Sequence, residues 1–83
     1  MKAEILLPDV ITWINDYIQK RNIKTYRIAM ALDVVQRSAR RRLNYETKIT
    51  LDEFFLIIDC LAKSSGRSSS SLLEECLKAT GKL

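Results

Sequence analysis

The stretch that most constrains the fold of this chain is residues 24–43, KTYRIAMALDVVQRSARRRL. Apolar residues recur there at the spacing of one helical face, on both sides of an interruption at Asp33 and Val34; they are Ile28, Ala29, Leu32, Ala39 and Leu43. This pattern predicts two short helices, about 25–32 and 35–44, joined by a tight turn. Because several of these side chains are small, the two helices can cross at close range and hold the outward face of the second helix clear of the body.

The second of these helices is strongly basic. It carries four arginines, and the segment from Lys20 to Lys48 has nine basic and two acidic residues, although the whole chain has a formal net charge of only +4. A positive charge concentrated on one element is the electrostatic footprint of a nucleic-acid-binding protein. The alternative interpretation is a basic face that is simply solvated.

Residues 8–63 resemble the Cro and lambda-repressor type of helix-turn-helix domain, also called the XRE family. Ile28-Ala29, Leu32, Val34, Ala39 and Leu43 stand where that family places its packing residues. The resemblance implies an all-α, five-helix fold with a short N-terminal arm. Two positions depart from the family pattern. Asp33 replaces the usual glycine of the turn, which aspartate tolerates because it enters the left-handed region more readily than most residues. Val35 replaces a capping serine or threonine.

The resemblance also implies which residues touch DNA. Base edges are expected to meet Val35, Gln36, Arg37, Arg40 and Arg41. The DNA backbone is expected to meet Lys24, Thr25, Tyr26, Arg42, Asn44, Tyr45 and Lys48. Arginine can bond both acceptors of guanine and glutamine can bond adenine in the same paired way. Arg42 has two possible partners, a phosphate or Glu46, and the negative charge of Asp33 weakens binding.

Two further helices complete the expected core. Pro8 suits the first turn of a helix over about 8–21, which Asn22 can end in the left-handed conformation. Trp13 lies at the border of its apolar stripe, either half-buried or contacting a partner. Thr50 and Glu53 form a capping box for the next helix. The core stripe expected on that helix is Leu51, Phe54, Phe55, Ile58, Leu61 and Ala62.

The tail, residues 64–83, is expected to add a connector and one short helix to the domain at 1–63. Residues 64–71 read as a polar, flexible linker, and Ser71 with Glu74 as a second capping box for a helix that Gly81 closes. Its apolar face can cover Leu56 and Cys60 in the same chain or in a second molecule. The expected dimerisation residues are therefore Leu56, Cys60, Leu72, Leu73, Cys76 and Leu77.

Several classes of protein are not indicated. No apolar run reaches the ~20 residues of a membrane span, and a signal peptide is not apparent, so a soluble cytoplasmic protein is expected. Histidine is absent and no catalytic spacing occurs, so an enzyme is not expected. Two cysteines cannot form a metal site alone, and both are expected to stay reduced. No cofactor or small-molecule ligand is inferred.

These features together favour a sequence-specific, double-stranded DNA-binding transcriptional regulator, repressor-like and phage or prophage encoded. A homodimer is expected, with an operator that is an inverted repeat. The alternative is a protein-binding regulator on the same scaffold, such as an antitoxin, an antirepressor or an inhibitor of a nucleic-acid enzyme. Outward apolar residues at Trp13, Met30 and Leu56 favour that alternative. RNA binding is less favoured because exposed aromatic residues are few.

Overall fold

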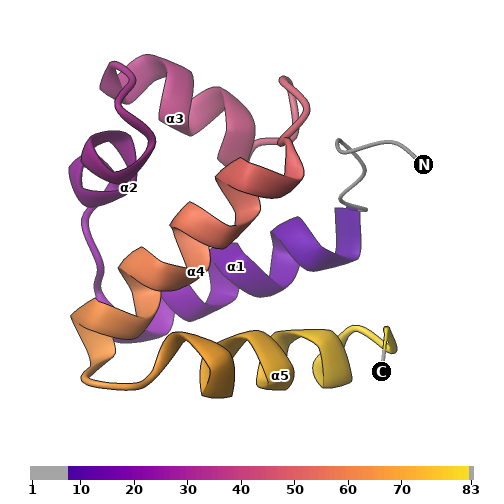
Figure 1. The fold of residues 1–83 in the computed structure, drawn as a ribbon. Helices are drawn as coiled ribbons and strands as arrows, with labels where there is room; N and C mark the ends of the chain where they lie inside the picture. Colours follow the sequence, from indigo (N-terminus) through magenta and orange to yellow (C-terminus); the bar gives the residue numbers. More distant parts are fainter. Residues whose placement is uncertain (1–7, 83) are drawn as a thin grey trace.

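The computed structural model describes residues 8–82 and shows an all-helical chain (Figure 1). The helices are α1 (Pro8–Arg21), α2 (Thr25–Leu32), α3 (Gln36–Leu43), α4 (Leu51–Ser65) and α5 (Ser69–Ala79). The all-α prediction is confirmed, and the predicted bounds of α1 and α2 agree with the structure. The expected N-terminal arm, residues 1–7, lies outside the described residues. None of the helices in the described part of the chain is long and apolar enough to cross a membrane.

Each helix packs chiefly against two others, so the five form a closed ring around one core. The contacts run from α1 to α3, from α3 to α2, from α2 to α4, from α4 to α5 and from α5 back to α1. Every helix contributes buried side chains to this core, for example Ile14, Ile28, Ala39, Ile58 and Leu72. Figure 1 shows α3 at the end of the molecule remote from α5, so the predicted recognition helix and the tail do not meet.

Left-handed residues other than glycine follow three of the described helices. Asn22 after α1 has φ of 54°, and Asp33 after α2 has φ of 57°, as the sequence predicts. The amide of Val34 then donates to the carbonyl of Ala29 at 3.0 Å, which closes the end of α2. Tyr45, after α3, also has a positive φ of 61°, which the sequence does not signal. A left-handed aromatic residue costs about 1 to 2 kcal/mol, so the surrounding packing must hold this turn in place.

The predicted core face of α4 is partly wrong. The capping box at its start is confirmed, since Thr50 accepts from the Glu53 amide and Glu53 accepts from the Thr50 amide. However, Leu51 and Phe55 are exposed, whereas Ile57 is fully buried. The reason is that α4 packs against α2 on one side and α5 on the other, which turns its buried face toward Ile57.

The predicted long, flexible connector and its capping box are also wrong. Helix α4 continues to Ser65, and only residues 66–68 separate it from α5. Ser68 caps α5 by accepting from the amide of Ser71 at 3.2 Å, so Ser71 does not cap it. The Ser69 hydroxyl donates to Asp59 at 2.6 Å, and this bond, followed by Lys63, lowers the pKa of the Asp59 carboxyl. These bonds tie the start of α5 to α4.

Helix α5 belongs to the core of its own chain. Leu72 and Cys76 are fully buried, and Leu73 and Leu77 are partly buried. Arg67, just before α5, forms an ion pair with Glu75 at 2.7 Å. Helix α5 therefore packs within its own chain, against α1 and α4, although not over Leu56 and Cys60 as the sequence analysis expected. A dimer contact through Leu72 and Cys76 would require α5 to leave the core.

Candidate nucleic-acid interface

The outward side of α3 presents three arginines, Arg37, Arg40 and Arg41, which we call the arginine face. All three are exposed, while Ala39 and Leu43 on the opposite side of the helix are buried against the core. Ala39 is fully buried, and its small side chain allows α3 to lie close to α2. The direction of the arginine face is therefore set by a short helix that is anchored by its inner side.

The arginine face is free of partners in the part of the chain that the structure describes. No ion pair or side-chain hydrogen bond involves these three guanidinium groups within residues 8–82. Elsewhere, five ion pairs join acidic and basic side chains: Asp16 with Lys20, Asp59 with Lys63, Glu74 with Lys78, Glu75 with Arg67 and Asp9 with Lys82. The basic residues of α1, α4 and α5 are thus largely neutralised, and the positive potential concentrates on α3.

Arg42, which the sequence predicts to contact the DNA backbone, is engaged within the chain, unlike the three arginines of this face. Its Nε lies 3.0 Å from Oε2 of Glu53, and its Nη1 donates to the Ser38 carbonyl at 3.1 Å. The two charged side chains are only 17% and 20% exposed. Arg42 therefore joins α3 to α4, and its carboxylate partner in the described chain is Glu53, not Glu46. Its place on the inner side of α3 separates it from the neighbouring Arg41.

The first turns of α2 and α3 are open to an anion. Their preceding residues, Lys24 and Val35, form no side-chain cap, whereas Thr50 and Ser68 cap α4 and α5. The first amide groups of an uncapped helix have no partner within the helix and carry a partial positive charge. Among the helices whose preceding residue is described, the two uncapped ones are thus α2 and α3, the pair that carries the arginine face. A phosphate oxygen is a suitable acceptor for such amides.

The remaining predicted contacts surround α3 unevenly. Lys24, Val35 and Gln36 are exposed, Thr25 is half-buried, and the exposed residues Asn44, Tyr45 and Lys48 follow α3 in the loop. The Asn44 amide lies 3.5 Å from Glu46, and both Tyr45 and Lys48 take part in interactions of their own. Tyr26, in contrast, lines a groove between α2 and α4. We therefore treat these residues as the edge of the candidate interface and the arginine face as its centre.

Sequence reasoning missed Asn15 as a residue that supports this surface. Its side-chain amide donates to the Leu43 carbonyl at 2.7 Å, which connects α1 to the last turn of α3. Asn15 sits on the polar side of the predicted α1, where no local pattern distinguishes it from a solvated residue. It became identifiable only once the packing of α1 against α3 was known.

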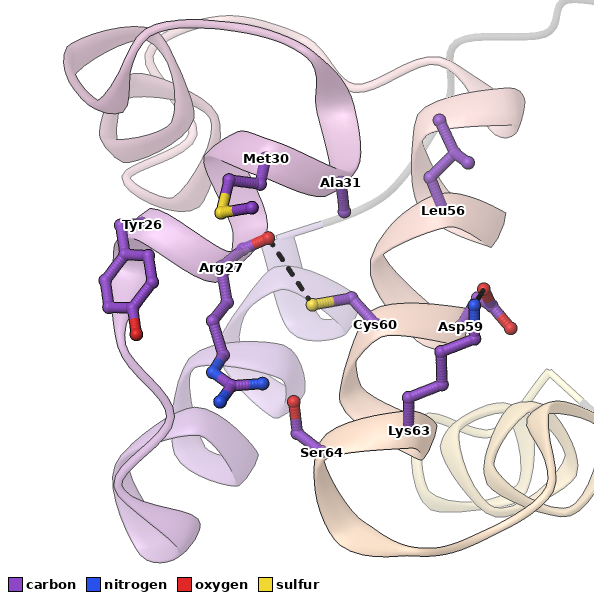
Figure 2. A pocket seen from close by; sticks show the side chains of 9 residues that line it. All are labelled: Tyr26, Arg27, Met30, Ala31, Leu56, Asp59, Cys60, Lys63 and Ser64. Atoms are coloured by element: carbon purple, nitrogen blue, oxygen red, sulfur yellow. Dashed lines mark hydrogen bonds and ion pairs between the residues drawn. The ribbon is translucent and has the colours of Figure 1, made fainter.

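A groove of about 560 Å³ lies between α2 and α4 (Figure 2). Cys60 is in its floor, with Sγ 3.6 Å from the carbonyl of Arg27, and burial raises the pKa of the Cys60 thiol. Helix α5 does not cover Leu56 or Cys60, contrary to one of the two predicted arrangements. Both cysteines are free, and the described residues contain no group of three side chains suited to a metal ion.

Comparison with protein-family models, with curated proteins and with solved structures finds no match to this chain. The support for the candidate interface therefore comes from its own residues and their geometry.

Proposed function

We propose that this chain is a sequence-specific, double-stranded DNA-binding regulator of the helix-turn-helix type, in which α3 enters the major groove. The observation that carries the proposal is the arginine face: three exposed guanidinium groups without carboxylate partners, on a helix whose other side is buried. The major groove is wide enough to admit an α-helix, and arginine is the residue that most often reads guanine there. The turn between α2 and α3 gives α3 the fixed direction that such reading requires.

The proposal divides the contacts into two kinds. Arg37 and Arg40 lie near the start and middle of α3, where a helix in the major groove meets base edges, and Val35 and Gln36 precede them. Arg41 lies between base and backbone. The open first turns of α2 and α3 hold phosphates, which position the protein but carry no sequence information.

DNA is favoured over RNA by the distribution of aromatic residues. The major groove of an RNA duplex is too deep and narrow for side chains to read, and unpaired RNA is recognised by stacking on aromatic rings. The most exposed aromatic residues, Tyr26, Tyr45 and Phe55, lie on three different elements, and none lies on α3. A stacking platform beside the arginine face is therefore missing from the described residues.

The test compares two triple variants that remove the same charge. One is Arg37→Ala with Arg40→Ala and Arg41→Ala, and the control is Lys20→Ala with Lys78→Ala and Lys82→Ala. Each control lysine pairs with a carboxylate away from α3 and outside the groove between α2 and α4. Duplexes enriched from a random library supply the preferred sequence, and fluorescence anisotropy measures affinity for it and for a scrambled duplex.

The arginine variant should lose preferred-duplex binding by more than about 100-fold, and the lysine control by less than about 10-fold, since base contacts contribute about 1 to 3 kcal/mol each. Circular dichroism checks that both variants are folded. Equal losses for the two variants would mean that only net charge matters. Failure of any duplex to enrich would contradict sequence-specific recognition.

A further inference from the structure

The groove between α2 and α4 has two chemically different halves (Figure 2). Met30, Leu56 and Cys60 form its apolar half. Arg27 and Lys63 form its cationic half, one turn further along α4, where the Asp59 carboxylate also lines the groove and pairs with Lys63. An occupant must therefore offer an apolar group and an anion in that order. The separation between them should be about one helical turn, the spacing of neighbouring residues on one helix face.

Both halves have unused binding capacity within the described chain. Met30 is 74% exposed and Leu56 is 45% exposed, although they face the same groove. The guanidinium group of Arg27 forms no ion pair or side-chain hydrogen bond with any residue from 8 to 82. Lys63 is already shared with Asp59 at 3.2 Å, so Arg27 is the available cation. An apolar groove with an adjacent charge is the form that a recognition surface takes.

The chain itself carries the complementary pair of groups on α4. Asp52 and Leu56 are four residues apart, so they lie on the same side of the helix. Asp52 is exposed and forms no ion pair with another described residue. When two copies of α4 are placed antiparallel, Leu56 of one copy faces Cys60 of the other. Asp52 then falls one turn further on, at the cationic half of the groove.

We propose that a second copy of this chain occupies the groove, with the two α4 helices antiparallel about a two-fold axis. Leu56 of each copy enters the apolar half of the other, and Asp52 of each pairs with Arg27 of the other. Such a surface is complementary to itself, which is the requirement for a closed two-fold dimer. The proposal does not rest on DNA binding, and it places the dimer contact on α2 and α4 rather than on α5.

The apolar half is tested by two leucine variants of α4, measured by sedimentation equilibrium of the full chain without DNA. Leu56→Glu should raise the dimer dissociation constant by at least about 100-fold, because the substitution acts twice in a two-fold interface. Leu51→Glu is the matched control, since Leu51 is also exposed but does not line the groove. It should change the dissociation constant by less than about 3-fold.

The cationic half is tested by a charge exchange. Arg27→Glu and Asp52→Arg should each raise the dimer dissociation constant by about 10-fold, and the double variant should return it to within about 3-fold of the original. Neither side chain has a partner to lose inside the described monomer, so the fold is kept. A wild-type chain that stays monomeric up to about 500 µM, a Leu51→Glu variant as impaired as Leu56→Glu, or a double variant that fails to recover would each overturn the proposal.

Discussion

Arg42→Ala is the substitution that most directly distinguishes a residue that holds α3 in place from one that touches DNA. Arg42 and Glu53 are mostly buried, and their charged atoms lie 3.0 Å apart. Removing the guanidinium leaves the Glu53 carboxylate without that partner and the Ser38 carbonyl without its side-chain donor. One oxygen of Glu53 still accepts from the Thr50 amide at 3.1 Å. The carboxylate is therefore only partly deprived of partners.

The free energy of unfolding lost in Arg42→Ala lies between two limits. Breaking a fully buried pair costs about 3 to 5 kcal/mol, and an exposed pair contributes about 0 to 1 kcal/mol. Because Arg42 and Glu53 keep about one-fifth of their surface exposed, we expect a loss of about 2 kcal/mol. A domain of this length has a total stability of about 4 to 12 kcal/mol, so the melting temperature should fall by roughly 8 to 16 °C.

The measurement is urea unfolding followed by circular dichroism, with Arg41→Ala as the control. Arg41 is the adjacent, exposed arginine, and its removal should change stability by less than about 0.5 kcal/mol. Below its melting temperature, Arg42→Ala should keep the salt dependence of DNA binding. A stability loss no larger than that of Arg41→Ala would refute the structural role. If the slope of log affinity against log salt concentration became less steep by about 0.9, Arg42 would instead contact a phosphate.

Three further predictions concern the arginine face, the tail and the thiols. Replacing Arg37 or Arg40 by Ala should cost about 1 to 3 kcal/mol on the preferred duplex and much less on a scrambled one, measured by competition titration; equal losses would mean a purely electrostatic contact. Deleting residues 68–83 should unfold the chain, because α5 fills the core, and a truncated chain with native circular dichroism would contradict this. Burial raises the pKa of the Cys76 thiol to about 11, so at about pH 8 a thiol reagent should label Cys60 first and Cys76 only on unfolding. Equal labelling rates in the folded protein would show that α5 opens readily.

The parts of the fold that the sequence predicted well are those with local signals. Asn22 and Asp33 end helices in the left-handed conformation, and Thr50 with Glu53 starts one, as expected. Each of these features depends on residues at most a few positions apart. The buried residues of α2 and α3 were also predicted, because both helices are short and present one clear apolar side.

The errors arose where distant residues decide between equivalent local choices. Four consecutive serines, residues 68–71, can each cap a helix, and the contacts of Ser69 with Asp59 and of Arg67 with Glu75 accompany the choice of Ser68. Likewise, α4 has apolar residues on more than one side, so its buried face depends on where α2 and α5 lie. The partner of Arg42 is eleven residues away and on another helix, which no helical spacing reveals.

In α3, the residues that anchor the helix to the core are separate from the residues of the arginine face. It buries only Ala39 and Leu43, so apolar packing alone gives it little anchorage. Polar contacts from other helices supply the rest, with Asn15 bonded to its last carbonyl and Arg42 paired with Glu53. None of these contacts uses the arginine face. Substitutions on that face should therefore alter recognition while leaving stability unchanged, whereas substitutions at Asn15 should move α3 and weaken recognition without touching DNA.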